Sequence, residues 1–229
     1  MSAFFVTGSG TEIGKTFVTA ALIHELRRRG SHVAALKPVA SGFDPAQAAA
    51  SDAGVLLAAL GALATPAAFD HIAPWRFDAA LSPDMAARRE DRVIDFAALT
   101  AHSRQAMALA RDTLLIEGVG GVMVPLDERH TVLDWIEALG IPAILVAGSY
   151  LGAISHALTA LDALQSRSLA VAALVVNETP ESSVALEETA TTIARFAGDV
   201  PVVTLPRLAQ ASEPHPAIGQ LTDLLARSA

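Results

Sequence analysis

The segment GSGTEIGKT (Gly8–Thr16) decides the fold of this chain. It follows a short apolar run of β-forming residues, 3–7, and it leads into residues 16–29, where apolar side chains recur at helical spacing. Backbone N–H groups at the start of a helix form an anion site, and glycines allow the backbone to close around phosphate oxygens. A strand, a glycine-rich loop ending in Gly-Lys-Thr and a helix, in that order, predict a phosphate-binding loop.

Two residues of this loop carry the expected chemistry. Lys15 can reach the β- and γ-phosphates of a nucleotide, and the Thr16 hydroxyl can ligate Mg²⁺. The spacing departs from the usual GxxxxGK pattern, because Gly8 stands one residue earlier than expected unless the loop is counted through Gly10. A glycine-rich turn without nucleotide is the alternative. The strand, loop and helix context favours nucleotide binding.

The remaining chain alternates between short apolar runs and helical patterns. We predict strands at 32–37, 113–117, 141–147, 169–176 and 200–205, and helices at 46–63, 95–111, 132–139, 153–167, 184–197 and 218–227. Residues 65–83, with three prolines, are predicted to be irregular. Continuous apolar strands are typical of a parallel sheet buried on both faces. We therefore predict a P-loop NTPase-like α/β fold: one domain, residues 1–229, with a doubly wound, mostly parallel sheet flanked by helices.

Composition excludes several classes of function. The 229 residues include no cysteine, which excludes disulfides, zinc–cysteine sites, iron–sulfur clusters and thiol catalysis. A net charge of −8 argues against nucleic acid or anionic lipid as a partner. No apolar run reaches the ~20 residues that span a bilayer, and the N-terminus lacks a basic signal region. We expect a cytoplasmic protein.

Lysine is scarce in this sequence. Of 16 basic residues only Lys15 and Lys37 are lysines, and the other 14 are arginines. Lys37 opens the segment KPVASG (37–42) after the second predicted strand, where ligands bind in such sheets. Lys37 could stabilise a developing anion and Ser41 could bind substrate. Alternatively, Lys37 extends to solvent from a strand end; its rarity slightly favours a function.

Two carboxylates are candidates for a metal site. Glu117 ends the strand predicted at 113–117 and precedes Gly118-Val119-Gly120-Gly121. The carboxyl end of a parallel strand lies near the phosphate loop, and Mg²⁺ takes one or two carboxylates with phosphate oxygens. The alternative is an incidental acid before a turn. Asp52 is the weaker candidate, since a solvated or helix-capping role explains it equally well.

In combination these segments resemble the dethiobiotin synthetase family. The matching pieces are the TGxxTExGKT form of the phosphate loop, KPVASG (37–42), Ser51-Asp52-Ala53, EGxGG (117–121), LGAISHA (151–157) and Asn177. The resemblance implies that ATP, CO₂ and 7,8-diaminononanoate give dethiobiotin, ADP and phosphate. The intermediates it implies are a carbamate and a carbamic-phosphoric anhydride. It also implies a homodimer, with Mg²⁺ as cofactor.

The resemblance also implies roles for individual residues. It implies Lys37, Lys15 and Thr11 as catalytic residues, and Thr16, Asp52 and Glu117 as metal ligands. The implied diamine site, completed across the dimer interface, comprises Thr11, Glu12, Lys37, Ser41, Gly152 and Ser155. The implied nucleotide site comprises Gly10, Glu12, Ile13, Gly14, Lys15, Thr16, Phe17, Asp52, Glu117, Gly118, Val119, Gly120, Asn177, Glu178, Pro206, Arg207, Leu208 and Glu213. In this set Asn177 would read adenine; otherwise it is a turn residue before Pro180.

Three residues depart from the usual pattern of this family, and two other functions are alternatives to it. Ser155 stands where the family usually has Asn, Val119 where Ala is common, and Glu178 where Asp is frequent. One alternative is another amide-forming synthetase of the superfamily, but such proteins usually carry a glutamine-hydrolysing domain with a catalytic cysteine. The other is a partition or positioning ATPase, which needs a basic patch or an amphipathic tail. Residues 218–229 are short and nearly neutral.

Overall fold

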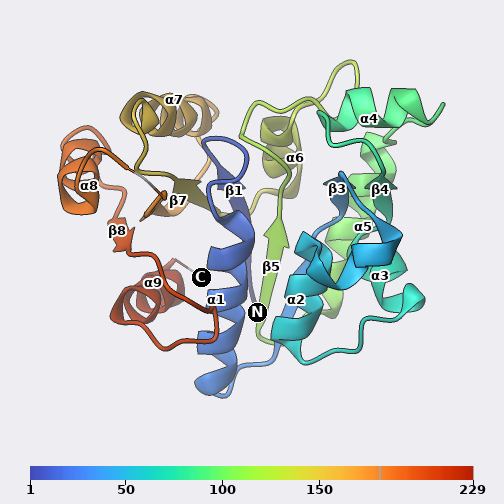
Figure 1. Cartoon of the computed structure of the whole chain (residues 1–229), viewed down its shortest axis with the longest axis horizontal. Coiled ribbons are helices and arrows are strands. Elements are labelled where there is room, and N and C mark those ends of the chain that lie inside the picture. The colour runs from blue at the N-terminus through green and yellow to red at the C-terminus, as the bar shows by residue number, and fades with distance from the viewer. Residues whose placement is uncertain (181, 229) are drawn as a thin grey trace.

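The computed structural model describes residues 1–180 and 182–228, built around a parallel sheet (Figure 1). Its six strands run in the order β2-β5-β1-β6-β7-β8, and each neighbouring pair is parallel. Their bounds are β1 Ser2–Gly8, β2 Val33–Leu36, β5 Thr113–Glu117, β6 Ala143–Ala147, β7 Val171–Asn177 and β8 Val202–Leu205. The predicted α/β fold and each predicted strand are confirmed.

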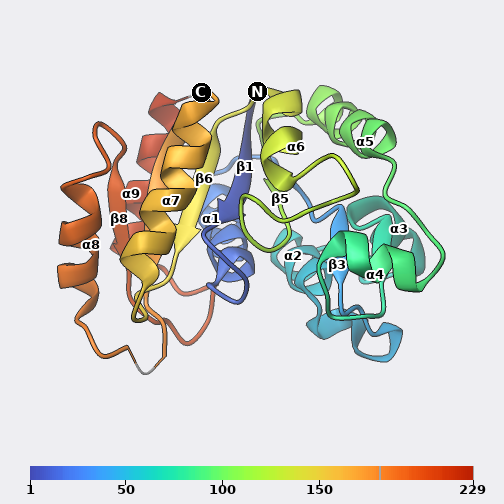
Figure 2. The same cartoon turned by 90° about the horizontal axis from the view of Figure 1, so that it is seen from above.

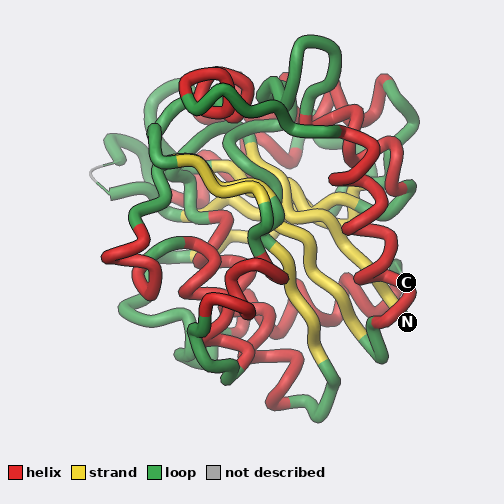
Figure 3. Tube along the Cα trace, turned by 90° about the vertical axis from the view of Figure 1, so that its right-hand side faces the viewer, coloured by secondary structure: helices red, strands yellow, loops and turns green. Residues whose placement is uncertain are grey.

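Helices cover both faces of the sheet (Figures 1 and 2). Helices α1, α2 and α9 pack side by side on one face; α6 and α7 lie on the other, with α5 against α6 and α8 against α7. The bounds of the helices are α1 Lys15–Arg28, α2 Asp52–Leu60, α3 Pro66–Ile72, α4 Pro83–Arg89, α5 Phe96–Leu109, α6 Val132–Leu139, α7 Ala153–Ser166, α8 Leu186–Ala194 and α9 Pro216–Arg227. The strands twist progressively across this layered core (Figure 3).

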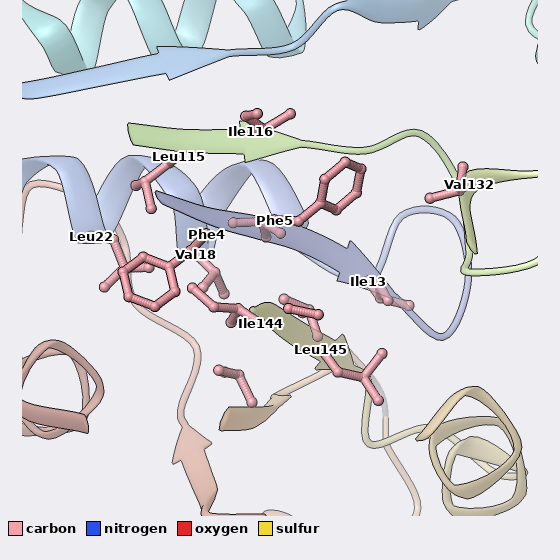
Figure 4. Close-up of a cluster of buried hydrophobic side chains, with 14 of the residues drawn as sticks. Phe4, Phe5, Ile13, Val18, Leu22, Leu115, Ile116, Val132, Ile144 and Leu145 are labelled. Carbon is pink, nitrogen blue, oxygen red and sulfur yellow. The ribbon is translucent and has the colours of Figure 1, made fainter. Parts of the chain in front are cut away.

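The core is built by the alternation of side chains along β1. Phe4 points toward α1, beside Leu22, whereas Phe5 points to the opposite face (Figure 4). There the ring of Phe5 meets the fully buried Trp135 of α6 edge-on, with ring centroids 4.8 Å apart. The indole Nε1 of Trp135 donates a hydrogen bond to the Ser103 hydroxyl at 3.2 Å. Both helical layers are therefore anchored to the central strand that leads into the phosphate loop.

The single helix predicted at 46–63 is wrong. The chain forms a 3₁₀ turn at Pro45–Ala50, breaks at Ser51 and starts α2 at Asp52. Ser51 Oγ donates to the Ala48 carbonyl at 2.6 Å and accepts from the Gly54 N–H at 3.2 Å. A serine side chain that accepts a hydrogen bond from a free N–H in the first turn stabilises the start of a new helix at that point. It therefore favours a break between the two segments over one continuous helix. The break places Asp52 in the first turn of α2.

The irregular segment predicted at 65–83 is also wrong. Thr65 caps α3, whose first residue is Pro66, a common pairing at helix starts. Next, β4 (Trp75–Phe77) pairs in parallel with β3 (Val39–Ser41) to form a separate two-stranded sheet. Helix α4 then begins at Pro83. This small sheet brings the loop 78–82 beside Ser41.

We expect Ser51→Ala to lower the free energy of unfolding by about 1 kcal/mol, because the N-terminal N–H of α2 loses its side-chain acceptor. Chemical denaturation measures this change. The matched comparison is Thr65→Ala, which removes the hydroxyl that accepts from the Ala68 N–H at 3.2 Å. A wild-type midpoint in Ser51→Ala would contradict the view that this cap defines the start of α2.

Within the described residues, no helix is long and apolar enough to cross a membrane.

Candidate active site

The loop between β1 and α1 is held in place by its neighbours at the carboxyl edge of the sheet. Ser9 N donates to the Val146 carbonyl of β6 at 2.9 Å, and Val122 N donates to the Gly8 carbonyl at 3.0 Å. Gly14 has φ 92°, in the left-handed region that favours glycine. The predicted strand–loop–helix arrangement is therefore present, with the loop open toward the edge where ligands bind in parallel sheets.

Lys15 folds back into the loop. Its side chain is buried, and Nζ donates to the Gly10 carbonyl at 2.8 Å. Burial, together with the nearby positive charge of Lys37, lowers the pKa of Lys15 to about 8. At pH 7 the group is still mostly protonated. The loop thus carries a positive charge surrounded by backbone, suited to a phosphate chain.

Lys37 lies inside a polar cluster and does not extend to solvent. The residue is 2% exposed, and its Nζ lies 2.8 Å from Glu117 Oε1 and 3.1 Å from Asp52 Oδ2. Nζ also donates to the Gly118 carbonyl at 2.6 Å. Thr16 Oγ1 donates to the same Glu117 oxygen at 2.7 Å. The solvent-directed alternative for Lys37 is wrong, because this ammonium balances two carboxylates.

The electrostatics of this cluster favour its charged forms. Burial by itself would lower the pKa of Lys37, but Glu117 and Asp52 outweigh it and raise that pKa. Burial would likewise raise the pKa of Asp52, yet the positive charge of Lys37 beside it holds that pKa below its usual value. Asp52, the weaker candidate on sequence, is therefore an ionised member of the cluster.

The oxygen atoms of the cluster fit a magnesium ion. Glu117 Oε2 is buried and has no hydrogen-bond partner among the described residues. The hydroxyl of Thr16 contacts the other oxygen of this carboxylate, Oε1, and the carboxylate of Asp52 contacts the same Lys37 ammonium as Glu117 does. Mg²⁺ prefers hard oxygen ligands and uses one or two carboxylates with phosphate oxygens and water. The cluster supplies two carboxylates and a hydroxyl, so phosphate oxygens and water would complete the shell of the ion. Within residues 1–180 and 182–228, no group of three or more His, Cys, Asp and Glu side chains could hold a metal ion by itself.

A cavity of about 720 Å³ opens over this cluster. The predicted site residues that line it are Thr11, Glu12, Gly14, Lys15, Thr16, Lys37, Ser41, Asp52, Val119 and Gly120. The remaining lining residues were not predicted from the sequence: Ala40, Ala80, Leu81, Ser82, Pro83 and Val124. The signal for part of this set was the Ser82-Pro83 pair, which marks the start of α4.

A second cavity, of about 350 Å³, lies on the other side of the loop. The two cavities share Glu12 and Gly14, so they adjoin along the loop backbone. The predicted residues that line the second cavity are Glu12, Ile13, Gly14, Phe17, Asn177, Glu178, Arg207 and Leu208; Thr179, Pro180 and Ala209 complete it. Glu178 Oε2 accepts from the Arg207 N–H at 2.8 Å, which ties the end of β7 to the end of β8.

Some predicted residues line neither cavity. Gly10 and Gly118 instead contribute the carbonyls that accept from the two lysines. Gly152 and Ser155 lie exposed at the start of α7. Pro206 and Glu213 lie beside and beyond the second cavity, and Glu213 is exposed. The single chain therefore brings Lys37 together with the residues predicted to bind phosphate and metal, but not with Gly152 and Ser155.

Comparison with known proteins agrees with this geometry. A family model described as an AAA domain matches residues 2–215. The chain is 51% identical over 202 residues to the ATP-dependent dethiobiotin synthetase BioD of Acidiphilium cryptum, covering 88% of this chain and 91% of that protein. It is 50% identical over 204 residues to the protein of the same name from Methylobacterium nodulans, covering 86% and 90%.

Solved structures show the same fold at low identity. The MinC:MinD cell division protein complex of Aquifex aeolicus matches with a TM-score of 0.59 and 12% identity, covering 99% of this chain and 95% of that one. The hydrogenase maturation factor HypB of Archaeoglobus fulgidus matches with a TM-score of 0.57 and 13% identity, covering 98% and 90%. At such identities the likeness shows that the chain has a P-loop NTPase fold, and it gives no information about activity.

The relatives that share half of the sequence carry the functional information. Their names describe an ATP-dependent ligase of biotin synthesis, and the chain covers nearly all of their length. The likeness to MinD gives no support to the positioning-ATPase alternative, because it extends to the fold alone. The phosphate loop, the buried Lys37 cluster and these relatives lead to one conclusion: the chain belongs to the ATP-dependent dethiobiotin synthetase family, and it is a ligase.

Proposed function

We propose that this enzyme converts 7,8-diaminononanoate, CO₂ and ATP into dethiobiotin, ADP and phosphate. One amine of the substrate adds to CO₂ and loses a proton to give a carbamate. A carbamate oxygen then takes the γ-phosphoryl group of ATP and releases ADP. The second amine attacks the carbonyl carbon, closes the five-membered ureido ring and expels phosphate. The observation that carries the proposal is the pair of buried lysines facing one cavity of about 720 Å³.

The two adjoining cavities suit the parts of ATP. The phosphates would lie against the N–H groups of the loop, with Lys15 at the γ-phosphate. The base would enter the second cavity beside Asn177 and Arg207. Thr16, Asp52 and Glu117 would hold Mg²⁺, whose charge neutralises the phosphate oxygens during transfer. The nucleotide would then present its γ-phosphate to the first cavity.

The remaining residues of the first cavity suit the acceptor substrate. Thr11, Glu12 and Ser41 would face the diamine, because they line that cavity together with Lys37. Lys37 would place its ammonium against the carbamate and its phosphorylated form, where negative charge develops. Thr11 would assist Lys15 and Lys37 in this step. Phosphoryl transfer depends mainly on positioning and charge stabilisation, so these groups account for the chemistry required.

We propose further that two copies of the chain associate. Gly152 and Ser155 are exposed at the start of α7 and line neither of the two cavities described above. In a dimer, each copy would use this segment to complete the diamine site of the other.

Three further expectations stay predictions. They are that residues 1–229 form a single functional domain, that the protein is cytoplasmic, and that neither nucleic acid nor membrane is a partner.

Release of ADP tests the proposed reaction. The enzyme is assayed with Mg²⁺ and ATP, and the diamine and bicarbonate are omitted in turn. We expect ADP release to require both, and mass spectrometry to detect dethiobiotin. Release that is independent of the diamine would leave the phosphate loop in place and overturn the substrate assignment.

A further inference from the structure

The side chain of Asn177 is bonded to the phosphate loop. Asn177 ends β7, and its Nδ2 donates to the carbonyl oxygen of Ile13 at 3.0 Å. The amide also lies directly against the next residue, because a Cβ atom added to Gly14 would lie 2.2 Å from the same nitrogen. Glycine at position 14 thus serves two needs: a backbone φ of 92° and room for the amide of Asn177.

This bond reaches the segment 10–14 of the loop, which otherwise is hydrogen-bonded only to residues of the loop itself and of α1 among the described residues. Hydrogen bonds from neighbouring elements hold Ser9 and Gly8, at the start of the loop. Farther along the loop, the carbonyl of Gly10 accepts a hydrogen bond from Lys15 Nζ, and the carbonyl of Gly14 accepts one from the N–H of Val18 in α1. Within residues 1–180 and 182–228, the bond from Asn177 is the hydrogen bond that connects the segment 10–14 to a strand distant in sequence.

The strand that carries Asn177 is a rigid support. Strand β7 lies between β6 and β8, and Asn177 itself pairs in register with Leu205. The next residue, Glu178, donates its N–H to the Leu205 carbonyl at 2.9 Å. The main chain of Asn177 is therefore held in the sheet, and through the bond from Nδ2 it holds the peptide unit between Ile13 and Gly14. That unit directly precedes the N–H groups of Lys15 and Thr16.

We infer that Asn177 is a positioning residue for the phosphate loop, in addition to lining the base cavity. One N–H of its amide is committed to Ile13, which leaves the other N–H and Oδ1 for a nucleobase. Loss of the bond would free the carbonyl of Ile13 and let the adjoining peptide rotate. The phosphate site would then have to be ordered by the ligand, at a cost in affinity.

The inference rests on the proposed function in one respect, which is that the nucleotide phosphates bind at this loop. Inorganic tripolyphosphate separates the two roles of Asn177, because it has phosphates and no base. A residue that acts through adenine alone would affect ATP and leave tripolyphosphate unchanged. A residue that positions the loop would affect both ligands.

The test compares wild type, Asn177→Ala and Gln165→Ala by calorimetric titration with ATP and with tripolyphosphate, each with Mg²⁺. Gln165→Ala is the control, since it also removes a side-chain amide, but Gln165 is exposed near the end of α7 and lines neither cavity. We expect Asn177→Ala to weaken tripolyphosphate binding by roughly five- to tenfold, the effect of one lost hydrogen bond. Gln165→Ala should leave tripolyphosphate affinity at the wild-type value.

Hydrogen exchange of the free enzyme is the second measurement. Asn177→Ala should speed exchange of the loop amides from Ile13 to Thr16, with the same overall melting temperature. Unchanged tripolyphosphate affinity with unchanged loop exchange would overturn the positioning role. Failure of the wild type to bind tripolyphosphate would instead contradict the phosphate assignment of the proposed function.

Discussion

Replacement of Lys15 by alanine is expected to lower turnover by at least about 10³-fold, the scale of a positioned cation in phosphoryl transfer. Lys15 Nζ lies inside the loop at 2.8 Å from the Gly10 carbonyl, and its pKa of about 8 keeps it mostly charged at neutral pH. Without it, the phosphate chain has no ammonium at the loop. Steady-state ADP release in the presence of diamine and bicarbonate measures the loss.

A thermal melt serves as the folding control for Lys15→Ala. Burial of this ammonium and its repulsion by Lys37 both disfavour its charge, as its lowered pKa shows. We therefore expect the variant to melt close to the wild-type temperature. Near-normal turnover in a folded variant would remove the assignment of Gly8–Thr16 as the phosphate loop.

Replacement of Lys37 by alanine is expected to lower the rate of product formation by about 10²–10³-fold, as for removal of one donor that stabilises transition-state charge. Nucleotide affinity should change much less, because Lys37 lies toward the first cavity and not in the loop. Turnover and titration with a non-hydrolysable ATP analogue measure the two quantities. An equal loss of both would make Lys37 a nucleotide ligand.

The same substitution should also weaken the fold. Lys37 and Glu117 are buried partners 2.8 Å apart, and Glu117 is fully buried. Removing one partner of a buried pair leaves an uncompensated charge and costs about 3–5 kcal/mol of stability. Lys37→Gln provides the control, since its amide can still donate to Glu117 and Gly118. It should recover part of the stability while the rate stays low; recovery of the rate would contradict the need for a positive charge.

Much of the fold follows from local sequence patterns. The continuous apolar runs of β5 and β6 predicted buried parallel strands, because a strand covered on both faces has no polar side to present. The errors fell at 46–63 and 65–83. There the structure depends on single capping residues, Ser51 and Thr65, which a pattern of apolar residues does not weigh.

Some parts of the candidate site could be predicted from the sequence, and others could not. The phosphate loop was evident because its residues are contiguous and its mechanism is local. The roles of Asp52 and Lys37 each stayed open on residues alone, and the resemblance to a family supplied what spacing did not. The lining residues at Ala80–Pro83 and the bond from Asn177 to Ile13 were not foreseen.

The sequence by itself determined the positions of the strands, their parallel class, the phosphate loop and the scarcity of lysine. The strands and the loop are each encoded in a short contiguous stretch, where the pattern of neighbouring residues sets the local conformation. Only the tertiary structure decided that Lys37 is a buried charge between Glu117 and Asp52, segments 80 and 15 residues away in the chain. The physical reason is that the energy of an ammonium depends on its burial and on the distance to its counter-charges. Both are set only when the end of β5 and the start of α2 meet the end of β2 at one edge of the sheet.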